Sequence, residues 1–388
     1  MIERLKRIDW TIVAILLLFM VASSLLIYSA TVDHPTYGAL NFHKKNVINY
    51  ALGFAVLFAA TFINYRILLK AAPYLYGIGI ILLVALYFFG EVRGGARGWF
   101  TIPVVNMDFQ PAELMKLIII IAISAFLRRK KGEPLQLWRD VVPIGLIVLV
   151  PFVLVVPHPD LGNAMIYLVI LIGMYWIGNI KYKHVLIGLA IMAALLAGMF
   201  WSYQQFHDEI VELADRMGIK HWVERIDTFI DPSAVSPRER YQFERSLIAI
   251  GSGGLTGDGF LKGNSVHNNF IPVVYSDAIF VVVGEEFGFT GAAVLLLLFF
   301  ILIYRMILVV IQTSDLGGSY IIVGIVTMFV FQIFQNIGMF IGLMPLTGIT
   351  LPFISYGGTS LLINMLSLGL VMSVRVHQEK ESMFSADA

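Results

Sequence analysis

The feature that most constrains this chain is a series of apolar runs, each long enough to cross a bilayer. A helix needs about 20 apolar residues to span the hydrocarbon core. Such runs predict ten membrane-spanning helices, near residues 10–29, 46–63, 74–90, 113–127, 141–157, 161–178, 183–202, 278–304, 319–341 and 356–374. The expected fold class is therefore all-α, with residues 1–388 forming one polytopic membrane domain.

The composition supports a membrane protein and excludes several function classes. Hydrophobic residues make up 58% of the chain and charged residues 14%, against about 25% charged in soluble domains. The net charge of +1 predicts no nucleic-acid binding by bulk electrostatics. The chain has no cysteine, which excludes disulfides, cysteine nucleophiles and cysteine metal sites.

Lysine and arginine predict the orientation of the spans, because they gather in cytoplasmic loops. With the N-terminus inside, the short outer loops hold four of these residues: Lys44, Lys45, Arg93 and Arg97. The inner segments hold fifteen: Arg4, Lys6, Arg7, Arg66, Lys70, Arg128, Arg129, Lys130, Lys131, Arg139, Lys181, Lys183, Arg305, Arg375 and Lys380. We therefore expect both termini to be cytoplasmic.

Residues 203–270 form one long segment between the seventh and eighth predicted spans, which this orientation places outside. The segment carries 10 acidic and 7 basic side chains. Apolar residues recur in it at helical spacing and predict amphipathic helices lying on the outer membrane surface. Those residues are Ile210, Leu213, Ala214 and Met217, then Trp222, Val223, Ile226 and Phe229. The alternative is a solvated extracellular cap.

Polar residues near the start of the fourth span form the first candidate site. Ionisable residues inside spans are costly, so each is a functional hypothesis. Glu113 and Lys116 are i,i+3 neighbours and can pair. Arg93 and Arg97 have the geometry to clamp phosphate oxygens, and Trp99 can stack on a sugar or join the interfacial aromatic belt. The alternative is an ion pair that anchors a helix end.

A second candidate site lies where the eighth span begins. Asp277 opens that helix, either as a functional group or as a first-turn acid favoured by the helix dipole. Glu285 follows eight residues later, rotated about 80° around the helix, so it is better placed than Glu286 to line the same cavity. Asp160 suits a helix N-cap. The glycine-rich residues 248–259 lack the lysine and strand of a nucleotide-binding loop, leaving a hinge or a close approach to a lipid headgroup.

The segment from Asn336 to Ser360 resembles the signature of the shape, elongation, division and sporulation (SEDS) family. It contains an Asn, then Gly-x-x-Pro, a further Gly, and Ser-Tyr-Gly-Gly-Thr-Ser. Residues 110–116, 159–162, 249–255 and 284–288 resemble four more family motifs, in the family's order. The resemblance covers nearly the whole chain. The short termini and the Asn-Ile-Gly-Met form are more similar to the elongation member RodA than to the division member FtsW.

The resemblance implies a peptidoglycan glycosyltransferase. Such an enzyme polymerises lipid II on the outer face of the bacterial cytoplasmic membrane and releases undecaprenyl pyrophosphate. The resemblance also implies a class B penicillin-binding protein and the elongation machinery as partners. Asp277 matches the family's essential aspartate. The family's Glu and His nearby are replaced here by Val273 and Tyr275, which argues against those neighbours as obligatory acid–base partners.

These considerations give a working assignment of roles. Asp277 is the expected general base, and Arg93, Arg97 and Lys116 are expected to stabilise pyrophosphate charge. Glu285 either tunes the site or helps to bind Mg²⁺ or Mn²⁺, and no nucleotide is expected. The full predicted substrate-binding set is Arg93, Arg97, Trp99, Glu113, Lys116, Glu285, Ser355, Tyr356, Gly357 and Gly358. The competing functions are a lipid II flippase, an FtsW-like division polymerase and a non-catalytic scaffold.

Overall fold

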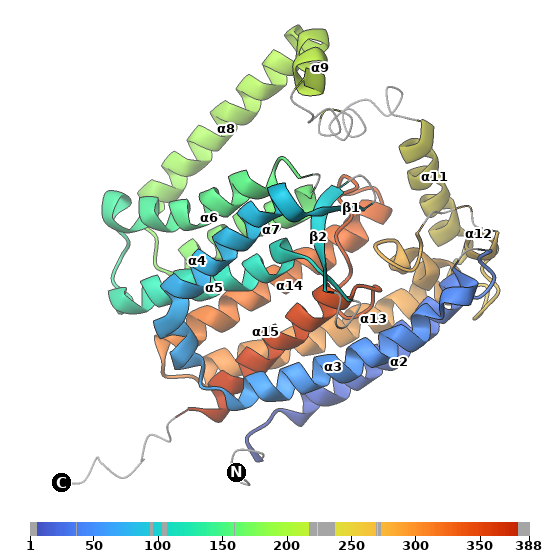
Figure 1. Cartoon of the computed structure of the whole chain (residues 1–388), viewed down its shortest axis with the longest axis horizontal. Helices are drawn as coiled ribbons and strands as arrows, with labels where there is room; N and C mark the ends of the chain where they lie inside the picture. Colours follow the sequence, from blue (N-terminus) through green and yellow to red (C-terminus); the bar gives the residue numbers. More distant parts are fainter. Residues whose placement is uncertain are drawn as a thin grey trace.

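The structure is a computed structural model, and it describes residues 6–35, 37–93, 96–102, 107–158, 160–216, 223, 237–268, 270 and 273–378. The described chain is a bundle of long helices with a small sheet against one end (Figure 1). The long helices are α2 (Trp10–Thr31), α3 (Phe42–Phe62), α4 (Tyr65–Phe89), α5 (Pro111–Lys130), α6 (Val142–Val155), α7 (Leu161–Ile177), α8 (Tyr182–Gln205), α13 (Ile279–Ile311), α14 (Leu316–Phe340) and α15 (Gly358–Val376).

The helices support a multi-pass membrane protein. Among the described residues, seven helical segments are long and apolar enough to cross a membrane. They are Trp10–Thr31, Gly38–Phe62, Tyr65–Phe89, Leu137–Val155, Ile279–Ile311, Leu316–Phe340 and Gly358–Val376. The other three predicted spans coincide with α5, which carries several charges, and with α7 and α8, whose apolar stretches are shorter. The total of ten spans stays a prediction.

Local sequence signals account for where several helices begin. Asp9, Asn64, Asp160 and Asp315 are the N-caps of α2, α4, α7 and α14, and each side chain accepts a hydrogen bond from a backbone N–H of the first turn. Pro111 begins α5, where a missing N–H is harmless. The N-cap predicted for Asp160 is confirmed.

The sheet was not expected from the sequence, which predicted only a loop there. Three short antiparallel strands, β1 (Glu91–Arg93), β2 (Ala96–Ile102) and β3 (Met107–Phe109), are paired in the order β1-β2-β3. Thr359, at the start of α15, donates a hydrogen bond to the backbone oxygen of Asp108 in β3. The strands therefore lie against the end of the bundle at which α15 begins.

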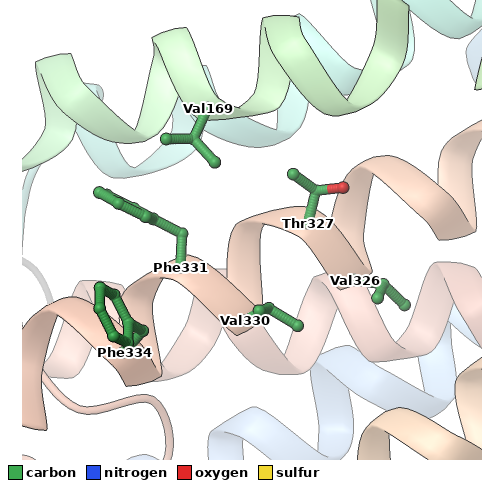
Figure 2. Close-up of a pocket in the computed structure, with 6 residues that line it drawn as sticks. All are labelled: Val169, Val326, Thr327, Val330, Phe331 and Phe334. Carbon is green, nitrogen blue, oxygen red and sulfur yellow. The ribbon is translucent and has the colours of Figure 1, made fainter. Parts of the chain in front are cut away.

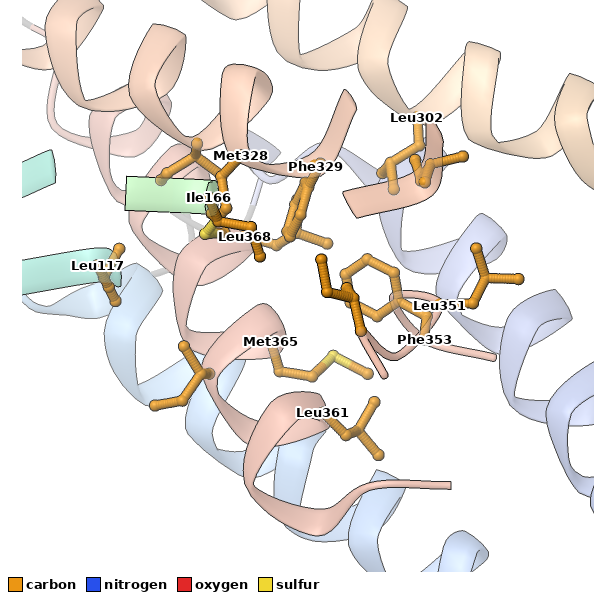
Figure 3. Packing of buried hydrophobic residues seen from close by; sticks show 14 of the residues in the cluster. Leu117, Ile166, Leu302, Met328, Phe329, Leu351, Phe353, Leu361, Met365 and Leu368 are labelled. Atoms are coloured by element: carbon orange, nitrogen blue, oxygen red, sulfur yellow. The ribbon is translucent and has the colours of Figure 1, made fainter. Parts of the chain in front are cut away.

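The core runs through the middle of the bundle. Figure 3 shows Leu117 of α5, Ile166 of α7, Met328 of α14 and Leu368 of α15 meeting in one cluster. α3 and α15 approach especially closely, because a Cβ at Gly369 would lie 2.7 Å from the Leu57 backbone oxygen. Small residues permit such close helix contacts inside membranes.

The two ends of the described chain meet at the opposite end of the bundle, here called the termini end. The Arg7 guanidinium donates to the Gln378 backbone oxygen at 2.8 Å. Asp9, only 2% exposed, accepts hydrogen bonds from Arg305, at 2.7 Å from Nη2, and from Arg375. This cluster of Asp9, Arg305 and Arg375, the termini clamp, joins α2, α13 and α15.

The segment between α8 and α13 is described in pieces. α8 leans away from the bundle in Figure 1 and has no buried residue among those described. The first predicted amphipathic stretch corresponds to α9 (His207–Arg216), whereas α11 (Pro237–Ser252) was not predicted. Met217 and the second predicted stretch, Val223 apart, lie outside the described residues.

Candidate active site

Asp277 lies in a turn two residues before α13, at the end of the bundle opposite the termini clamp, here called the site end. Its side chain is half-buried, and Oδ1 accepts a hydrogen bond from the Ala278 N–H at 3.2 Å. A Cβ on Gly348 would lie 3.9 Å from Oδ2. Because Gly348 has a φ of +72°, a side chain there would be strained. Gly348 therefore places no side chain against the carboxylate.

The backbone around Asp277 is held by residues of the family-like signature. The Asn336 side-chain amide donates to the Asp277 carbonyl and to the Ile349 carbonyl, both at 2.7 Å. The Tyr356 N–H donates to the Tyr275 carbonyl at 3.0 Å. Asn336 is fully buried. These contacts connect α14 and the segment before α15 directly to the position of the carboxylate.

α13 is interrupted eleven residues after Asp277. Gly288 has φ 60° and ψ −157°, which is not helical, so residues 279–287 form a short helical segment of their own. The backbone N–H groups of Asp258 and Gly259 donate to the carbonyls of Glu285 and Glu286, each at 3.0 Å. The glycine-rich loop thus satisfies carbonyls that the interruption leaves without helical partners.

The same loop also supplies acceptors to the second part of α13. The N–H groups of Phe289 and Thr290 donate to the carbonyls of Gly254 and Leu255, at 2.9 and 3.0 Å. A Cβ at Gly257 would lie 2.2 Å from the Glu286 carbonyl oxygen, so no larger residue fits without a shift. This loop therefore packs on the protein's own backbone at Gly257, and the hinge or lipid contact expected from the sequence stays a prediction.

Glu285 holds a neighbouring backbone segment, whereas the sequence predicted that it lines the cavity at Asp277. Its carboxylate is 1% exposed and accepts hydrogen bonds from the N–H groups of Ser265 (2.6 Å) and Val266 (3.1 Å). These are first-turn groups of the short helix α12 (Asn264–His267). Glu286 is also buried, and it contacts Ser29 and, at 3.4 Å, His267. Both glutamates therefore tie the short segment of α13 to its neighbours.

The predicted divalent cation stays a prediction. The described residues contain no group of three or more His, Asp or Glu side chains that could hold a metal ion. Both oxygens of Glu285, the residue named for that role, already accept backbone hydrogen bonds. No step of the mechanism below runs through a metal.

The predicted pair of Glu113 and Lys116 is present in the first turns of α5. Lys116 Nζ lies 2.7 Å from Glu113 Oε2, with Lys116 fully buried and Glu113 6% exposed. Burying such a pair is favourable only when both charges are compensated. Beside it, Asp160 accepts hydrogen bonds from the side-chain amides of Gln110 and Asn163, both at 2.8 Å.

The surroundings of Asp160 change the pKa of its carboxyl group. Burial raises the pKa of the Asp160 carboxyl above its usual 3.8, although hydrogen bonds from Asn163 oppose the rise. The negative charge of Glu113 raises this pKa further, and the positive charge of Lys116 lowers it. Asp160 is therefore an N-cap whose pKa also depends on the charges of Glu113 and Lys116.

The loop of residues 345–349 connects the two polar groups. Gly162 lies two residues after Asp160. A Cβ on Gly162 would lie 2.4 Å from Ile349 Cγ1 and 3.3 Å from the Thr347 carbonyl oxygen. The Gln335 amide holds the same loop through Pro345 and Thr347, at 3.1 and 3.2 Å. Gly348 in its middle faces Asp277. The structure thus brings Asp277 and the Glu113–Lys116 pair to one end of the bundle, on either side of this loop.

The predicted residues 355–358 divide into two kinds. Ser355 is buried, and its hydroxyl accepts a hydrogen bond from the Leu351 N–H at 2.8 Å, which shapes the loop. Tyr356 is half-buried and its ring lies 4.8 Å from that of Phe42 and 5.9 Å from that of Tyr275. Gly357 and Gly358, also half-buried, begin α15. Tyr356 is therefore the side chain of this group best placed to meet a ligand.

Tyr275 belongs to an aromatic cluster next to Asp277. Its ring stacks on Phe42 at 4.7 Å and meets Tyr37 edge-on at 5.1 Å. Burial raises the pKa of Tyr275 to about 12, with Tyr37, Tyr356 and Asp277 adding to the rise. The phenol therefore stays protonated at neutral pH and cannot serve as a base there.

The loop residues near the sheet are only partly described. Trp99 is half-buried in β2, opposite Glu91 of β1. The backbones of Arg93 and Arg97 lie in the same hairpin, but their side chains are outside the described part of the chain. Their predicted phosphate contacts stay a prediction.

An apolar groove of about 310 Å³ lies elsewhere, between α7 and α14 (Figure 2). Val169, Val326, Val330, Phe331 and Phe334 line it, and Thr327 is its single polar lining residue. Because no ionisable side chain lines it, this groove is not the catalytic centre.

Sequence reasoning named Asn336 only as part of the family-like signature, with no contact assigned to it, and passed over two further amides of α14, Gln332 and Gln335. All three are fully buried. The signal that could have found them is their spacing, because residues 332 and 336 are one helical turn apart and fall on nearly one face.

Comparisons with known proteins show the family to which the chain belongs. The model of a family described as cell cycle protein, and named for FtsW, RodA and SpoVE, matches residues 5–380. The chain is 30% identical over 375 residues to the peptidoglycan glycosyltransferase MrdB of Escherichia coli (strain K12), covering 96% of this chain and 95% of that protein. It is 31% identical over 376 residues to stage V sporulation protein E of Bacillus subtilis (strain 168), covering 94% and 96%.

A solved structure is also similar. It is described as "Structural coordination of polymerization and crosslinking by a peptidoglycan synthase complex". The likeness has a TM-score of 0.78 at 26% identity and covers 96% of this chain and 99% of the other.

Proposed function

This chain belongs to the FtsW, RodA and SpoVE family, and from that premise we propose that it is a peptidoglycan glycosyltransferase that polymerises lipid II into glycan strands. The observation that carries the proposal is the placement of Asp277. Asp277 is half-buried rather than sealed, its backbone is fixed by Asn336, and Gly348 places no side chain against its carboxylate. A general base needs this combination of fixed geometry and access.

In the proposed reaction Asp277 accepts the proton of the acceptor sugar's 4-hydroxyl. The freed oxygen attacks the anomeric carbon of the donor, and the bond from that carbon to the pyrophosphate oxygen breaks. Undecaprenyl pyrophosphate leaves with the bonding electrons. One carboxylate base suffices because the configuration inverts in a single displacement.

Positive charge near the leaving group stabilises the negative charge that develops there. Lys116 is our candidate for that role, and Glu113 holds its ammonium at 2.7 Å. Arg93 and Arg97 are further candidates, and Trp99 and Tyr356 are candidates for contacts with sugar rings. Glu285 leaves this set, because it is 1% exposed and its carboxylate accepts hydrogen bonds from two backbone N–H groups of α12.

We place the protein in the bacterial cytoplasmic membrane, with both termini in the cytoplasm and Asp277 at the outer face. The excess of inner lysine and arginine supports this orientation. The contact between Arg7 and Gln378 supports it too, because both ends of the chain must then lie on one side. We assign the chain to cell elongation, with division or sporulation as the alternatives that the similarity to stage V sporulation protein E keeps open.

We also propose that a class B penicillin-binding protein is the partner and supplies cross-linking. The support is the similar structure, described as a complex that coordinates polymerisation and cross-linking. The elongation machinery would then position both proteins on the cell wall.

The test is polymerisation of lipid II by purified protein, alone and with the partner. We expect Asp277→Asn to lower the rate by about 10²–10⁴-fold, the usual contribution of general acid–base catalysis. Asp208→Asn, at an exposed carboxylate of α9, is the matched control and should keep full activity. Full activity of Asp277→Asn would contradict the assignment of the base.

Two further arms separate the alternatives. Movement of labelled lipid II across liposomes without any polymer would favour a flippase. Loss of activity in EDTA, with recovery in Mg²⁺ or Mn²⁺, would show that the predicted cation is needed.

A further inference from the structure

Two loops that follow neighbouring helices are held side by side. They are residues 131–141, between α5 and α6, and residues 178–181, between α7 and α8. The Leu135 N–H donates to the Asn179 carbonyl at 3.2 Å, and the Asn179 side-chain amide donates to the Gly132 carbonyl at 3.0 Å. Residues adjacent to these contacts are therefore close neighbours, although they belong to two different helix pairs.

Both loops lie at the termini end of the bundle. A Cβ on Gly178 would lie 2.9 Å from Leu127 Cδ2, so α7 ends beside the last turn of α5. In that turn, Arg128 Nε lies 3.7 Å from Asp315 Oδ1. Asp315 accepts a hydrogen bond from the Tyr65 hydroxyl at 2.6 Å, and the Tyr65 N–H donates to a serine in the last turn of α15. In the proposed orientation, this end is cytoplasmic.

The basic residues at this end are of two kinds. Those that contact an acidic side chain are Arg128, Lys130, Arg305 and Arg375. Those that are exposed, and that form no ion pair with another described residue, are Arg129, Lys131, Arg139, Lys181 and Lys183. We call these five residues the basic surface. Residues 129–139 and 181–183 contain one acidic residue, Glu133, so the basic surface carries an excess of positive charge.

Part of the basic surface lies where the fold disfavours positive charge. Lys181 is the N-cap of α8 and Lys183 lies in its first turn, which contains no acidic residue. The helix dipole disfavours cations at this end of a helix, and neighbouring like charges repel one another. An anion bound at the basic surface would offset both costs.

Exposed aromatic side chains border the basic surface. Trp138 is 79% exposed, Tyr182 is 75% exposed and Trp176 is 68% exposed. The rings of Trp176 and Tyr182 meet edge-on, with their centroids 6.5 Å apart. Trp and Tyr gather at the level of the lipid headgroups, where one part of the ring is apolar and the other is wet. The basic surface therefore lies at headgroup level rather than out in the cytoplasm.

We propose that the basic surface binds the headgroup of an anionic phospholipid in the cytoplasmic leaflet. Clusters of lysine and arginine directly beside a membrane span attract anionic lipids, and their N–H groups donate charge-assisted hydrogen bonds to phosphate oxygens. The bordering aromatic side chains favour a lipid over an acidic protein segment. The inference goes beyond the proposed function and does not depend on Asp277, but it uses the proposed orientation.

The bound headgroup would contact both loops and hold the start of α8. This helix leans away from the bundle in Figure 1 and has no buried residue among those described. A contact through Lys181 and Lys183 would therefore connect its inner end to the loop between α5 and α6. The lipid should stabilise the folded protein, because a ligand that binds only the folded state raises Tm.

The first test measures Tm of the purified full-length protein in a neutral detergent during lipid titration. We expect phosphatidylglycerol to raise Tm, and phosphatidylcholine with the same acyl chains to leave it unchanged. Inorganic phosphate is the third arm and should have little effect. Equal rises with the two lipids would overturn the proposal. A full rise with phosphate alone would also overturn it, because the site would then bind a free anion.

Variants locate the effect. We expect Lys181→Gln combined with Lys183→Gln to raise the phosphatidylglycerol concentration at half the Tm rise by about 10- to 30-fold, from about 5-fold for each lysine. Lys44→Gln combined with Lys262→Gln is the matched control, because it removes the same charge from exposed lysines at the site end. The control should keep the wild-type value. Equal weakening in both double variants would overturn the proposal.

A second pair of substitutions tests whether the two loops form one site. Lys131→Gln combined with Arg139→Gln, in the other loop, should weaken the lipid effect by a similar factor, and an unchanged value would overturn the shared site. This pair also replaces the first if that variant does not fold. No arm requires polymerisation. Intact polymerisation without any lipid effect would overturn this inference and leave the proposed function standing.

Discussion

The two ends of the bundle differ in how many of their buried polar groups are paired. At the termini end, Asp9 accepts hydrogen bonds from two arginines, and Asp140, 2% exposed, lies 3.1 Å from Lys130. At the site end, several buried atoms have no hydrogen-bond partner among the described residues. They are Asn163 Oδ1, Glu286 Oε2, Gln332 Oε1 and Nε2, Gln335 Oε1, Asn336 Oδ1 and Asn364 Oδ1.

The difference indicates which end of the bundle stabilises the fold and which end binds a ligand or water. Each buried polar atom without a partner costs about 1–3 kcal/mol, so an end rich in them gives up stability. Proteins accept such losses at functional sites, where a ligand or water completes the network. Substitutions at the termini end should therefore affect stability, and substitutions at the site end should affect activity.

The largest effect is expected from Asp9→Ala. The change leaves Arg305 and Arg375 facing each other without their shared carboxylate, which should lower the free energy of unfolding by about 3 kcal/mol. Activity per folded molecule should be retained. Thermal unfolding in detergent and polymerisation of lipid II measure the two quantities. A large loss of kcat at unchanged Tm would reverse the contrast between the ends.

Asn336→Leu should give the opposite result. The substitution removes both hydrogen bonds that hold the Asp277 and Ile349 carbonyls. Misplacing a catalytic group by about 1 Å can lower the rate by about 100-fold, and we expect a kcat loss of that order. The same two measurements apply. Asn364→Leu is the control, because its side chain is buried at the same end but holds neither carbonyl.

Gly288→Ala tests the interruption of α13. The residue has φ +60°, and an added Cβ would lie 2.5 Å from the Gly257 backbone nitrogen. Strain of this kind costs about 1–3 kcal/mol, and the loop must also shift. We expect a lower Tm together with a lower kcat, because the shift moves the segment that follows Asp277. Gly77→Ala is the control, with nothing within 4 Å of the added Cβ.

Asp160→Asn should have the smallest effect, visible in its pH dependence. The pKa of Asp160 is raised above 3.8, so the folded protein binds the proton more tightly than the unfolded chain. Its contribution to stability is full below pH 3.8 and is lost as pH rises through the raised pKa. Asn is an equally good N-cap, so the Tm of the variant should gain on the wild type as pH rises from that value. A constant Tm difference across this range would contradict the raised pKa.

Patterns along the chain predicted the apolar helices, the i,i+3 pair of Glu113 and Lys116 and the N-cap role of Asp160. Each depends on residues within one or two turns of each other, so local geometry determines them. That Asp277 lies close to the start of a helix was predictable for the same reason, although the helix begins two residues later than expected.

The role of Glu285 could not be predicted from local helix geometry. Its predicted role assumed that Asp277 and Glu285 share one regular helix, whereas Asp277 lies in the preceding turn and the partners of Glu285 are backbone groups 19 and 20 residues away. The glycine-rich loop could not be assigned either, because its task depends on an interruption at Gly288 that no local pattern announces. Gln335 and Asn336 of α14 hold the loop of residues 345–349 and the backbone of Asp277, and such contacts cannot be read from the pattern of a single helix.

The termini clamp also bears on the order in which the protein is made. Asp9 is synthesised 366 residues before Arg375. During translation its contact with Arg375 therefore forms only after α15 has been made. Until then its charge is balanced at most by Arg305, and before that by neither arginine. Closure of the clamp therefore requires the last turn of α15 to be in place beside the start of α2.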